Sequence, residues 1–441
     1  MLELISLFHL CLCSSILLFA GKMIASGRPS LLAVTAIGFI LIDSLGITFA
    51  PYLRLSDIEY LNNPTFLINE KNADLYLLQV SAHWIFFFFV LFGLILEVLQ
   101  KPKNIIRRTI TPGAIKLFSG LLIMLGLIFY FRYFIIGPGL NILLNSRITF
   151  SSTSEAIAQR LELRYNLENG QGSYLASLAS KIIFPLSVAL LIGNKIRLNI
   201  LIWLMGFSLS AIYAFQTREK APLIAIFVLY SALFLWNRIA SKNVNTRSIF
   251  RLAIPAALVF FIGGAIFYSL NFGLDFSAAI TAIVARTIAI PGTAETNFFF
   301  VFPEIYDFRG LANIFRIGLL GYGGQDTSIY EVAVAATGDA FATNASMLAV
   351  AWSGAGYFGV IIISFILTSI IYLIDYFLAR SDFQIFVLSA ILSMPALVGL
   401  TSGSVIDYMS WGGVVSPVLL IIMSNLHSLT FKRRKYVGQS S

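Results

Sequence analysis

Arginines between the apolar segments are the residues best suited to chemistry in this sequence. Arg160 and Arg164 are four positions apart in a stretch, 154–167, whose composition favours a helix, so they should share one helix face. Each guanidinium carries a fork of donors that fits phosphate oxygens. Spacing alone leaves two alternatives open: an anion shared by the two side chains, or contacts with lipid headgroups and the nearby Glu162 and Glu168.

Two further arginines have unusual surroundings. Arg286 interrupts the apolar run TAIVARTIAIP, where a lone charge is unfavourable unless it is paired or functional. Arg218 belongs to the charged cluster 216–222, for which snorkelling to a membrane surface is the alternative interpretation. We take Arg160, Arg164, Arg218 and Arg286 as candidate diphosphate-binding residues, and Arg164 and Arg286 also as candidate catalytic residues.

Such arginines suit a reaction in which a sugar–diphosphate bond breaks. Negative charge grows on the leaving group, and either a metal ion or fixed guanidiniums can stabilise it. The sequence has no D-x-D pair, no H-E-x-x-H motif and no Walker motif, and its histidines (His9, His83 and His427) lie in or beside apolar segments. We therefore expect metal-independent transfer, with no metal ligands and no cofactor.

A carboxylate would accept the proton of the attacking hydroxyl in such a transfer. Spacing does not choose among the acidic residues of the long polar stretches, which are Glu155, Glu162, Glu168, Asp275, Glu295, Glu304, Asp307, Asp326, Glu331 and Asp339. We select Glu295 as the candidate catalytic carboxylate. A different acid, Asp43, is the one clear acidic residue in the middle of an expected membrane span, and the sequence names no partner for it.

Composition places these residues in a membrane protein. Of the 441 residues, 58% are hydrophobic and 12% are charged, whereas a soluble domain has about 25% charged residues. This composition excludes a soluble globular protein. The net charge of +9 is better explained by basic cytoplasmic loops than by a nucleic-acid partner.

The apolar runs predict one all-α, polytopic membrane domain over residues 1–441. Its expected spans are 3–20, 31–51, 76–99, 114–136, 175–193, 198–214, 222–237, 251–270, 356–378, 383–400 and 410–427. More than half of the 30 basic residues fall in short loops on one side. The chain should therefore have a periplasmic N-terminus, a cytoplasmic C-terminus and two large periplasmic loops, 137–174 and 271–355.

Aromatic and glycine residues of the second loop have two interpretations each. Rings from Phe298 to Tyr322 suit either stacking on sugars or a membrane-interface belt. The run 354–359 matches G-x-G-x-x-G but follows no expected strand, so close helix packing is the better interpretation.

Taken together, these motifs resemble the Wzy family of O-antigen and oligosaccharide repeat-unit polymerases. The resemblance is carried by Arg160-Leu161-Glu162-Leu163-Arg164, Gly172-Ser173-Tyr174-Leu175 with Phe184-Pro185, the cluster Gln216 to Pro222, Arg286 with Ile290-Pro291-Gly292-Thr293, and Asn344 before Gly356 to Val360. One departure is Thr287, where some relatives carry a second arginine, so that Arg218 or Arg309 would complete the diphosphate clamp.

The resemblance implies a GT-C-like glycosyltransferase in the bacterial inner membrane. Its implied substrates are undecaprenyl-diphosphate-linked oligosaccharides at the periplasmic face, with membrane lipids and a chain-length regulator protein as further partners and no nucleic acid. Two alternatives stay open. An O-antigen ligase would resemble this architecture but relies on a histidine in its large periplasmic loop, which is missing here. A lipid-linked oligosaccharide flippase or other transporter would show repeats and polar broken helices in mid-membrane.

Overall fold

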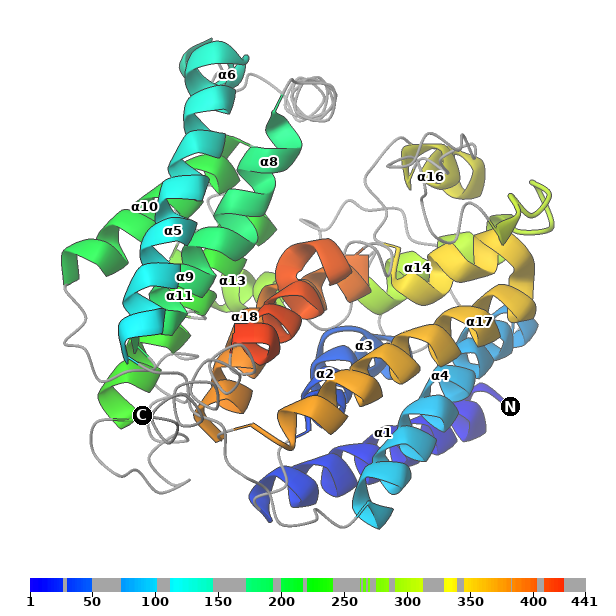
Figure 1. Ribbon diagram of the computed structural model, residues 1–441. Helices are drawn as coiled ribbons and strands as arrows, with labels where there is room; N and C mark the ends of the chain where they lie inside the picture. Colours follow the sequence, from blue (N-terminus) through cyan, green and yellow to red (C-terminus); the bar gives the residue numbers. More distant parts are fainter. Residues whose placement is uncertain are drawn as a thin grey trace. The chain divides into compact units, whose positions relative to one another are not determined.

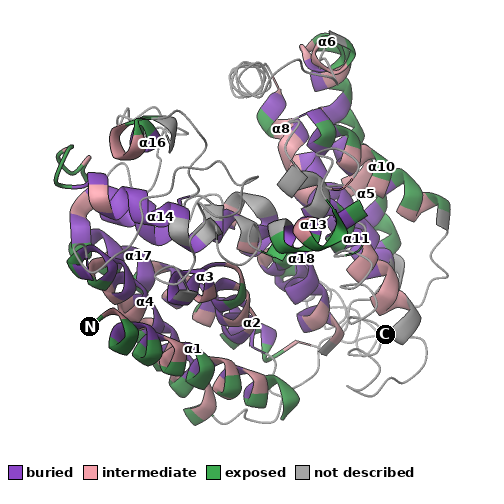
Figure 2. Cartoon of the chain, turned by 180° about the vertical axis from the view of Figure 1, so that it is seen from behind, coloured by how far each residue is buried: buried purple, intermediate pink, exposed green. Residues whose placement is uncertain are grey.

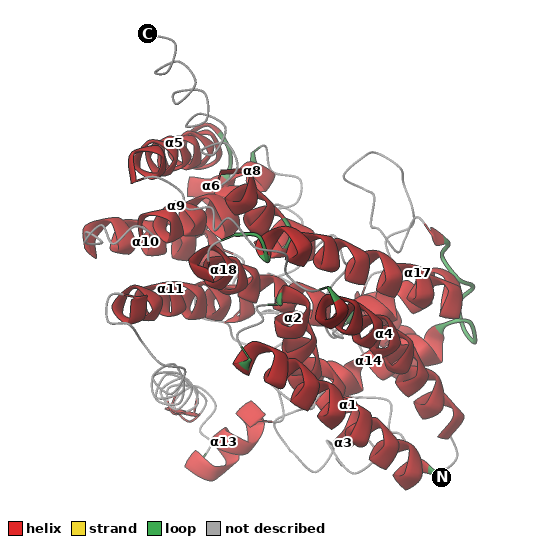
Figure 3. Ribbon diagram, turned by 60° about the horizontal axis from the view of Figure 1, so that its bottom comes forward, coloured by secondary structure: helices red, strands yellow, loops and turns green. Residues whose placement is uncertain are grey.

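The computed structural model describes residues 1–26, 30–49, 73–100, 112–145, 172–192, 200–216, 220–240, 262, 265–266, 269, 275–284, 290–311, 329–338, 345–381, 383–402 and 408–423. Within these ranges, every element of regular secondary structure is a helix (Figure 3). The expected all-α class is therefore confirmed for the part of the chain that the structure describes.

The chain divides into two compact units. Unit 1 comprises 1–101, 245–375 and 399–408, and unit 2 comprises 102–244, 376–398 and 409–441. The helices of unit 1 are α1 (Leu2–Ala25), α2 (Leu31–Phe39), the π-helix η1 (Ile40–Ser44), α3 (Leu45–Phe49), α4 (Ala73–Leu99), α13 (Phe276–Val284), α14 (Ile290–Val301), α16 (Ile329–Thr337) and most of α17 (Met347–Leu378). The helices of unit 2 are α5 (Pro112–Phe131), η4 (Arg132–Ile136), α6 (Gly139–Asn145), α8 (Ser173–Leu178), η5 (Ala179–Ile183), α9 (Phe184–Ile192), α10 (Ile200–Gln216), α11 (Lys220–Ala240), most of α18 (Phe383–Ser402) and η8 (Met409–Gly413).

Seven helical segments among the described residues are long and apolar enough to cross a bilayer. They are Leu2–Ala25, Leu31–Thr48, Ala73–Leu99, Ile115–Ile136, Ser173–Leu191, Met347–Leu378 and Gln384–Thr401, and Leu201–Gln216 and Ala225–Asn237 are shorter apolar helices. Large apolar side chains such as Leu18, Phe88 and Phe131 are more than half exposed, as expected for surfaces that face lipid. The protein is thus a polytopic helical membrane protein, and the full set of eleven spans stays a prediction.

Polar contacts join the spans of unit 1 at both of their ends. At one end, Asp375 of α17 accepts hydrogen bonds from the backbone N–H groups of Leu31 and Leu32, at the start of α2. Near that end, Gln100, which follows α4, donates to the Tyr372 hydroxyl of α17. Spans that alternate in direction require residues near 31, 100 and 375 to share one side. The packing of unit 1 agrees with that alternation.

At the other end of these spans, polar contacts join the start of α1, the end of α3 and the start of α4. The hydroxyls of Ser6 and Tyr76 are hydrogen bonded at 2.8 Å, and the Tyr76 hydroxyl also donates to the Ile47 carbonyl at 3.3 Å. The two longer helices of this group, α1 and α4, lie side by side (Figure 1). These residues share the side that the basic-residue pattern predicts to be periplasmic.

Helix α14 packs against this second group, although it belongs to the expected loop 271–355. It contacts η1, α3 and α4, and Figure 2 shows it largely in the colour of buried residues. Its docking depends on Gly292, where a Cβ atom would lie 2.6 Å from the Ile47 backbone nitrogen and 2.8 Å from the Asp43 carbonyl oxygen. The described part of this loop is therefore built partly into the core of unit 1.

Unit 2 is held by hydrogen bonds between small polar residues. Ser180 donates to the Ser210 carbonyl at 3.0 Å, and Ser210 donates back to the Ser180 carbonyl at 2.8 Å. At one end of the helices, Gln216 donates to the Gly139 carbonyl at 2.7 Å. Small side chains allow the close helix approach that packing inside a membrane requires.

The run Gly354 to Gly359 interrupts a helix instead of only packing against one. Helical geometry fails at Ala355 and Gly356, and Gly356 has a φ of +58°, a backbone conformation that favours glycine. Beside the break, the backbone N–H groups of Arg309 and Gly310 donate to the carbonyls of Ser353 and Gly354. A helical segment that begins at Met347 precedes this break, and the expected span 356–378 begins at the break itself.

Candidate functional site

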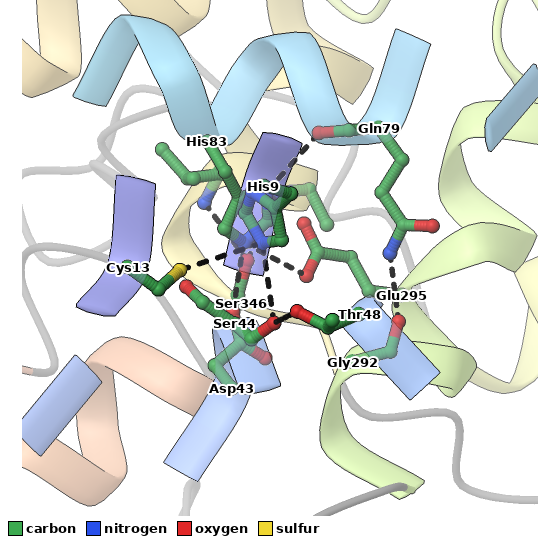
Figure 4. Close-up of polar contacts among 12 residues, drawn as sticks. His9, Cys13, Asp43, Ser44, Thr48, Gln79, His83, Gly292, Glu295 and Ser346 are labelled. Atoms are coloured by element: carbon green, nitrogen blue, oxygen red, sulfur yellow. Dashed lines mark hydrogen bonds and ion pairs between the residues drawn. The ribbon is translucent and has the colours of Figure 1, made fainter. Parts of the chain in front are cut away.

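A buried group of two carboxylates and one imidazole lies between η1, α4 and α14. His83 Nε2 is 3.1 Å from Asp43 Oδ2 and 3.8 Å from Glu295 Oε2. All three side chains have zero exposure. Figure 4 shows the three side chains converging, with His9 and Ser44 beside them. We call Asp43, His83 and Glu295 the buried triad.

Local structure explains how the triad is assembled. Asp43 lies in the π-helix of the second span, and such single-turn widenings of a helix are frequent at functional sites. Gln79, one turn before His83, fixes α14 to α4: its side chain donates to the Gly292 carbonyl at 2.7 Å and accepts from Thr296 at 2.8 Å. These contacts place Glu295 opposite His83.

The carboxylates of the triad are poorly satisfied by the chain. Among the described residues, Asp43 Oδ1 and both Glu295 oxygens have no hydrogen-bond partner. The Ser346 hydroxyl and the Asp43 carboxyl group nevertheless lie close enough to the Glu295 carboxyl group to act on it as hydrogen-bonding groups. Glu295 belongs to α14, which is not one of the seven candidate spans. Burial, and then the nearby Asp43 carboxylate, raise the pKa of Glu295 well above its ordinary value.

Both ring nitrogens of His83 face acceptors. Nδ1 is 3.1 Å from the Gln79 carbonyl oxygen, which can only accept, so Nδ1 carries a proton. Nε2 then faces the Asp43 and Glu295 carboxylates. Either Nε2 is also protonated, which makes His83 an imidazolium, or Nε2 offers its lone pair to a cation.

His9 flanks the triad without joining it. Its Nε2 lies 3.2 Å from the Ser44 carbonyl oxygen and 3.8 Å from the Cys13 sulfur. Its ring centroid is 6.0 Å from that of His83. Cys13 is buried and Cys11 is exposed, so the two cysteines do not meet at one point as metal ligands would.

Of the five residues selected from sequence as catalytic or diphosphate-binding, only Glu295 lies in the described part of the chain. Arg160, Arg164, Arg218 and Arg286 lie outside it, and so does the expected helix 154–167. Their convergence on one anion stays a prediction. Arg309, which we considered for completing the clamp, lies 3.1 Å from Glu331 and stacks over Tyr306. The Glu331 carboxylate therefore competes with any anion for Arg309.

The expected aromatic surface of the second loop is partly a core. Phe298, Phe299 and Phe302 are at most 1% exposed, and Trp352 packs against Phe299 with ring centroids 5.0 Å apart. The Trp352 indole N–H donates to the Phe302 carbonyl at 2.8 Å. For these three phenylalanines, sugar stacking and an interface belt are both wrong, because their side chains are buried inside unit 1.

Asp43 and His83 are site residues whose grouping the sequence did not predict. The sequence did show that Asp43 and His83 lie in apolar spans. An ionisable residue inside a membrane span is usually functional or paired with another residue. Their pairing with Glu295 was not visible, because the three residues come from separate segments of the chain.

No family profile, curated protein or solved structure matches this chain. The class defined by the fold is therefore a polytopic, all-helical membrane protein with a buried carboxylate–imidazole site.

Proposed function

We propose that the protein is a glycosyltransferase that polymerises undecaprenyl-diphosphate-linked oligosaccharide repeat units into O-antigen or surface polysaccharide. The transfer takes place at the periplasmic face of the bacterial inner membrane and uses arginines to stabilise the diphosphate leaving group. The motifs from Arg160 to Val360 support this assignment, and no comparison with a known protein bears on it.

One structural observation carries the proposal: α14 docks where the second span ends. Gly292 meets Ile47, and the predicted topology assigns that end of the span to the periplasm. Arg286 is four residues before the first residue of α14, so the chain confines it within ~14 Å of that residue. The proposal requires Arg286 to act on that side of the membrane, where a lipid-linked diphosphate is presented.

The buried triad is a poor place for the transfer itself. Its three side chains have zero exposure, so a substrate hydroxyl cannot reach Glu295 in this conformation. Glu295, selected from the sequence as a catalytic carboxylate, is better explained as part of an internal site. The general base then belongs to the remaining acidic residues of the two long loops.

Arginine variants test the proposal. A charge-assisted hydrogen bond contributes about 1.5–3 kcal/mol, so losing one that acts in the transition state slows turnover about 10- to 150-fold. Arg164→Ala and Arg286→Ala should shorten the polysaccharide ladder at equal protein level. Lysine keeps the charge and loses the planar fork, so Arg→Lys variants should be impaired less.

Arg380 offers the matched control. Its guanidinium donates to the Tyr376 carbonyl at 2.7 Å and stacks on the Tyr376 ring, on the side predicted to be cytoplasmic. Arg380→Ala should leave the ladder unchanged. Normal ladders from both Arg164→Ala and Arg286→Ala at normal protein level would contradict the arginine clamp.

A deletion strain separates the polymerase from the two alternatives. Loss of a polymerase leaves lipid A core capped with a single repeat unit. Loss of a ligase leaves the core uncapped while polymer accumulates on the lipid carrier, and loss of a flippase prevents the unit from reaching the periplasm. The capped core is the result that supports the proposal.

A transporter is the second candidate, because the structure contains a feature that favours it. The second span is widened by a π-helix at Asp43, and this acid faces His83 and Glu295 inside unit 1. Buried ionisable groups at irregular helices are typical of coupling sites in transporters. Movement of fluorescent lipid-linked oligosaccharide across proteoliposomes, abolished by Asp43→Asn, would favour this candidate over the polymerase.

A further inference from the structure

We propose that the buried triad binds one divalent transition-metal ion, which fixes α14 to the second and third spans. This site is independent of the diphosphate chemistry. Motif spacing led us to expect no metal ligands, but that search covers residues close together in sequence. Asp43, His83 and Glu295 come from three separate segments, η1, α4 and α14.

The geometry is close to that of a metal site. One ligand atom from each residue lies within 4.8 Å of the other two, whereas metal–ligand bonds of about 2.0–2.2 Å keep ligand atoms within about 4.4 Å of one another. The separations from His83 to Asp43 and Glu295, 3.1 and 3.8 Å, already meet this condition. The ligand atoms of Asp43 and Glu295, at most 4.8 Å apart, would approach one another by up to about 1.4 Å to reach the roughly 3.4 Å separation of a tetrahedral site.

The orientation of His83 is the one that metal ligation requires. Histidines that bind metals commonly donate their second ring N–H to a carbonyl or carboxylate, which directs the other nitrogen's lone pair at the ion. Here the Gln79 carbonyl accepts from Nδ1 at 3.1 Å, and Nε2 faces both carboxylates. Gln79 also binds the Gly292 carbonyl and Thr296, so one residue supports two of the three ligands.

Charge balance favours a divalent ion. Two ionised carboxylates inside an apolar core are strongly unfavourable unless positive charge compensates them. A divalent ion with neutral His83 gives a site of zero net charge. It would also bind Glu295 Oε2, one of the buried carboxylate oxygens that lack a hydrogen-bond partner among the described residues. A mixed imidazole and carboxylate set suits zinc, iron or manganese, whereas calcium and magnesium favour oxygen ligands alone.

The rival occupant is a proton. An imidazolium at His83, an ionised Asp43 and a protonated Glu295 would also sum to zero charge, with no metal present. This state leaves a different signature, because Glu295→Gln mimics the protonated acid and would be tolerated. In the metal-bound site the same substitution removes a negatively charged ligand.

Metal content of the purified protein tests the site without any assay of activity. Full-length protein is purified in detergent from cells supplied with zinc, iron and manganese, and its metals are quantified by mass spectrometry. We expect about one divalent ion per chain that resists dialysis, because all three ligands are sealed from solvent. Glu295→Gln and Asp43→Asn should each lower this content at least tenfold.

Asp375→Asn is the matched control. Asp375 is a buried carboxylate of the same unit, but its oxygens accept from the start of α2 and it is not part of the triad. This variant should keep the full metal content. Should a triad variant fail to fold, the wild type still decides the question: after metal release in denaturant, refolding with Co²⁺ should restore one visibly absorbing ion per chain.

Two results would overturn the metal site. One is a wild-type protein without stoichiometric metal and without Co²⁺ uptake. The other is a folded Glu295→Gln variant that retains the full metal content. Neither result affects the proposed polymerase, whose test reads polysaccharide length.

Discussion

The buried carboxylates of unit 1 differ in how many hydrogen bonds they accept: Asp375 accepts several, whereas Asp43 and Glu295 accept few. Asp375 accepts from the N–H groups of Leu31 and Leu32, at 2.6 and 2.8 Å, and from the Ser30 hydroxyl at 3.3 Å. Asp43 and Glu295 face one imidazole, and three of their four oxygens lack a hydrogen-bond partner among the described residues. All three residues lie in the same unit and are at most 3% exposed.

The difference separates a structural acid from a binding site. The first N–H groups of a helix have no partner within the helix, and Asp375 supplies acceptors to two of them at the positive end of the α2 dipole. These contacts account for Asp375, although Glu97 beside it has one buried oxygen, Oε1, without a hydrogen-bond partner among the described residues. Glu97 as a whole is only half-buried. For the triad, the described residues provide few donors, and the proposed metal ion would supply the compensating positive charge.

Removing the structural acid should give the largest loss of stability. Asp375→Ala leaves the Leu31 and Leu32 N–H groups without their acceptor, and each such buried donor costs about 1–3 kcal/mol. We expect a loss of about 3–5 kcal/mol, read as the shift in thermal unfolding in detergent. Asp375→Asn keeps one acceptor oxygen and should lose less. An unchanged unfolding temperature in Asp375→Ala would contradict the structural role of Asp375 at the start of α2.

Metal removal should give the next largest effect, and only where the triad is intact. An ion at a hundredfold excess over its dissociation constant stabilises the folded state by about 2.7 kcal/mol. Prolonged chelation under mildly denaturing conditions should therefore lower the unfolding temperature of the wild type and of Asp375→Asn. Glu295→Gln should not respond to the chelator. Equal responses in all three proteins would show that the triad is not the source of the effect.

A substitution outside the triad should also reduce metal binding. In Gly292→Ala the new methyl group would lie 2.6 Å from the Ile47 nitrogen, and such overpacking costs about 1–3 kcal/mol. Helix α14 would shift away from η1 and carry Glu295 away from Asp43. We expect reduced metal content although all three ligands remain. Gly120→Ala is the control, since nothing lies within 4 Å of its added Cβ.

Much of the fold follows from hydropathy. The expected spans 31–51 and 76–99 agree with the helical segments Leu31–Thr48 and Ala73–Leu99, because each apolar run is as long as the bilayer is thick. The helical segment from Met347 to the break at Ala355 was not predicted. The glycines of 354–359 were interpreted as packing residues, whereas Gly356 adopts a positive φ that breaks the helix.

The site was less predictable than the fold. Asp43 stood out as an acidic residue in an apolar span, but hydropathy does not predict which helices pack against that span. Its partner His83 became visible only when η1 and α4 were placed together. Glu295 was selected as a base on the solvent side of the membrane. The close approach of α14 at Gly292 buries it instead.

The central claim from the structure is that Asp43, His83 and Glu295 bind one divalent metal ion together. X-ray absorption at the metal edge of the purified protein tests it most directly. We predict nitrogen and oxygen ligands at about 2.0–2.2 Å, with the scattering pattern of a single imidazole that disappears in Asp43→Asn. A sulfur ligand at about 2.3 Å, which would implicate Cys13, or a protein without bound metal would contradict the claim.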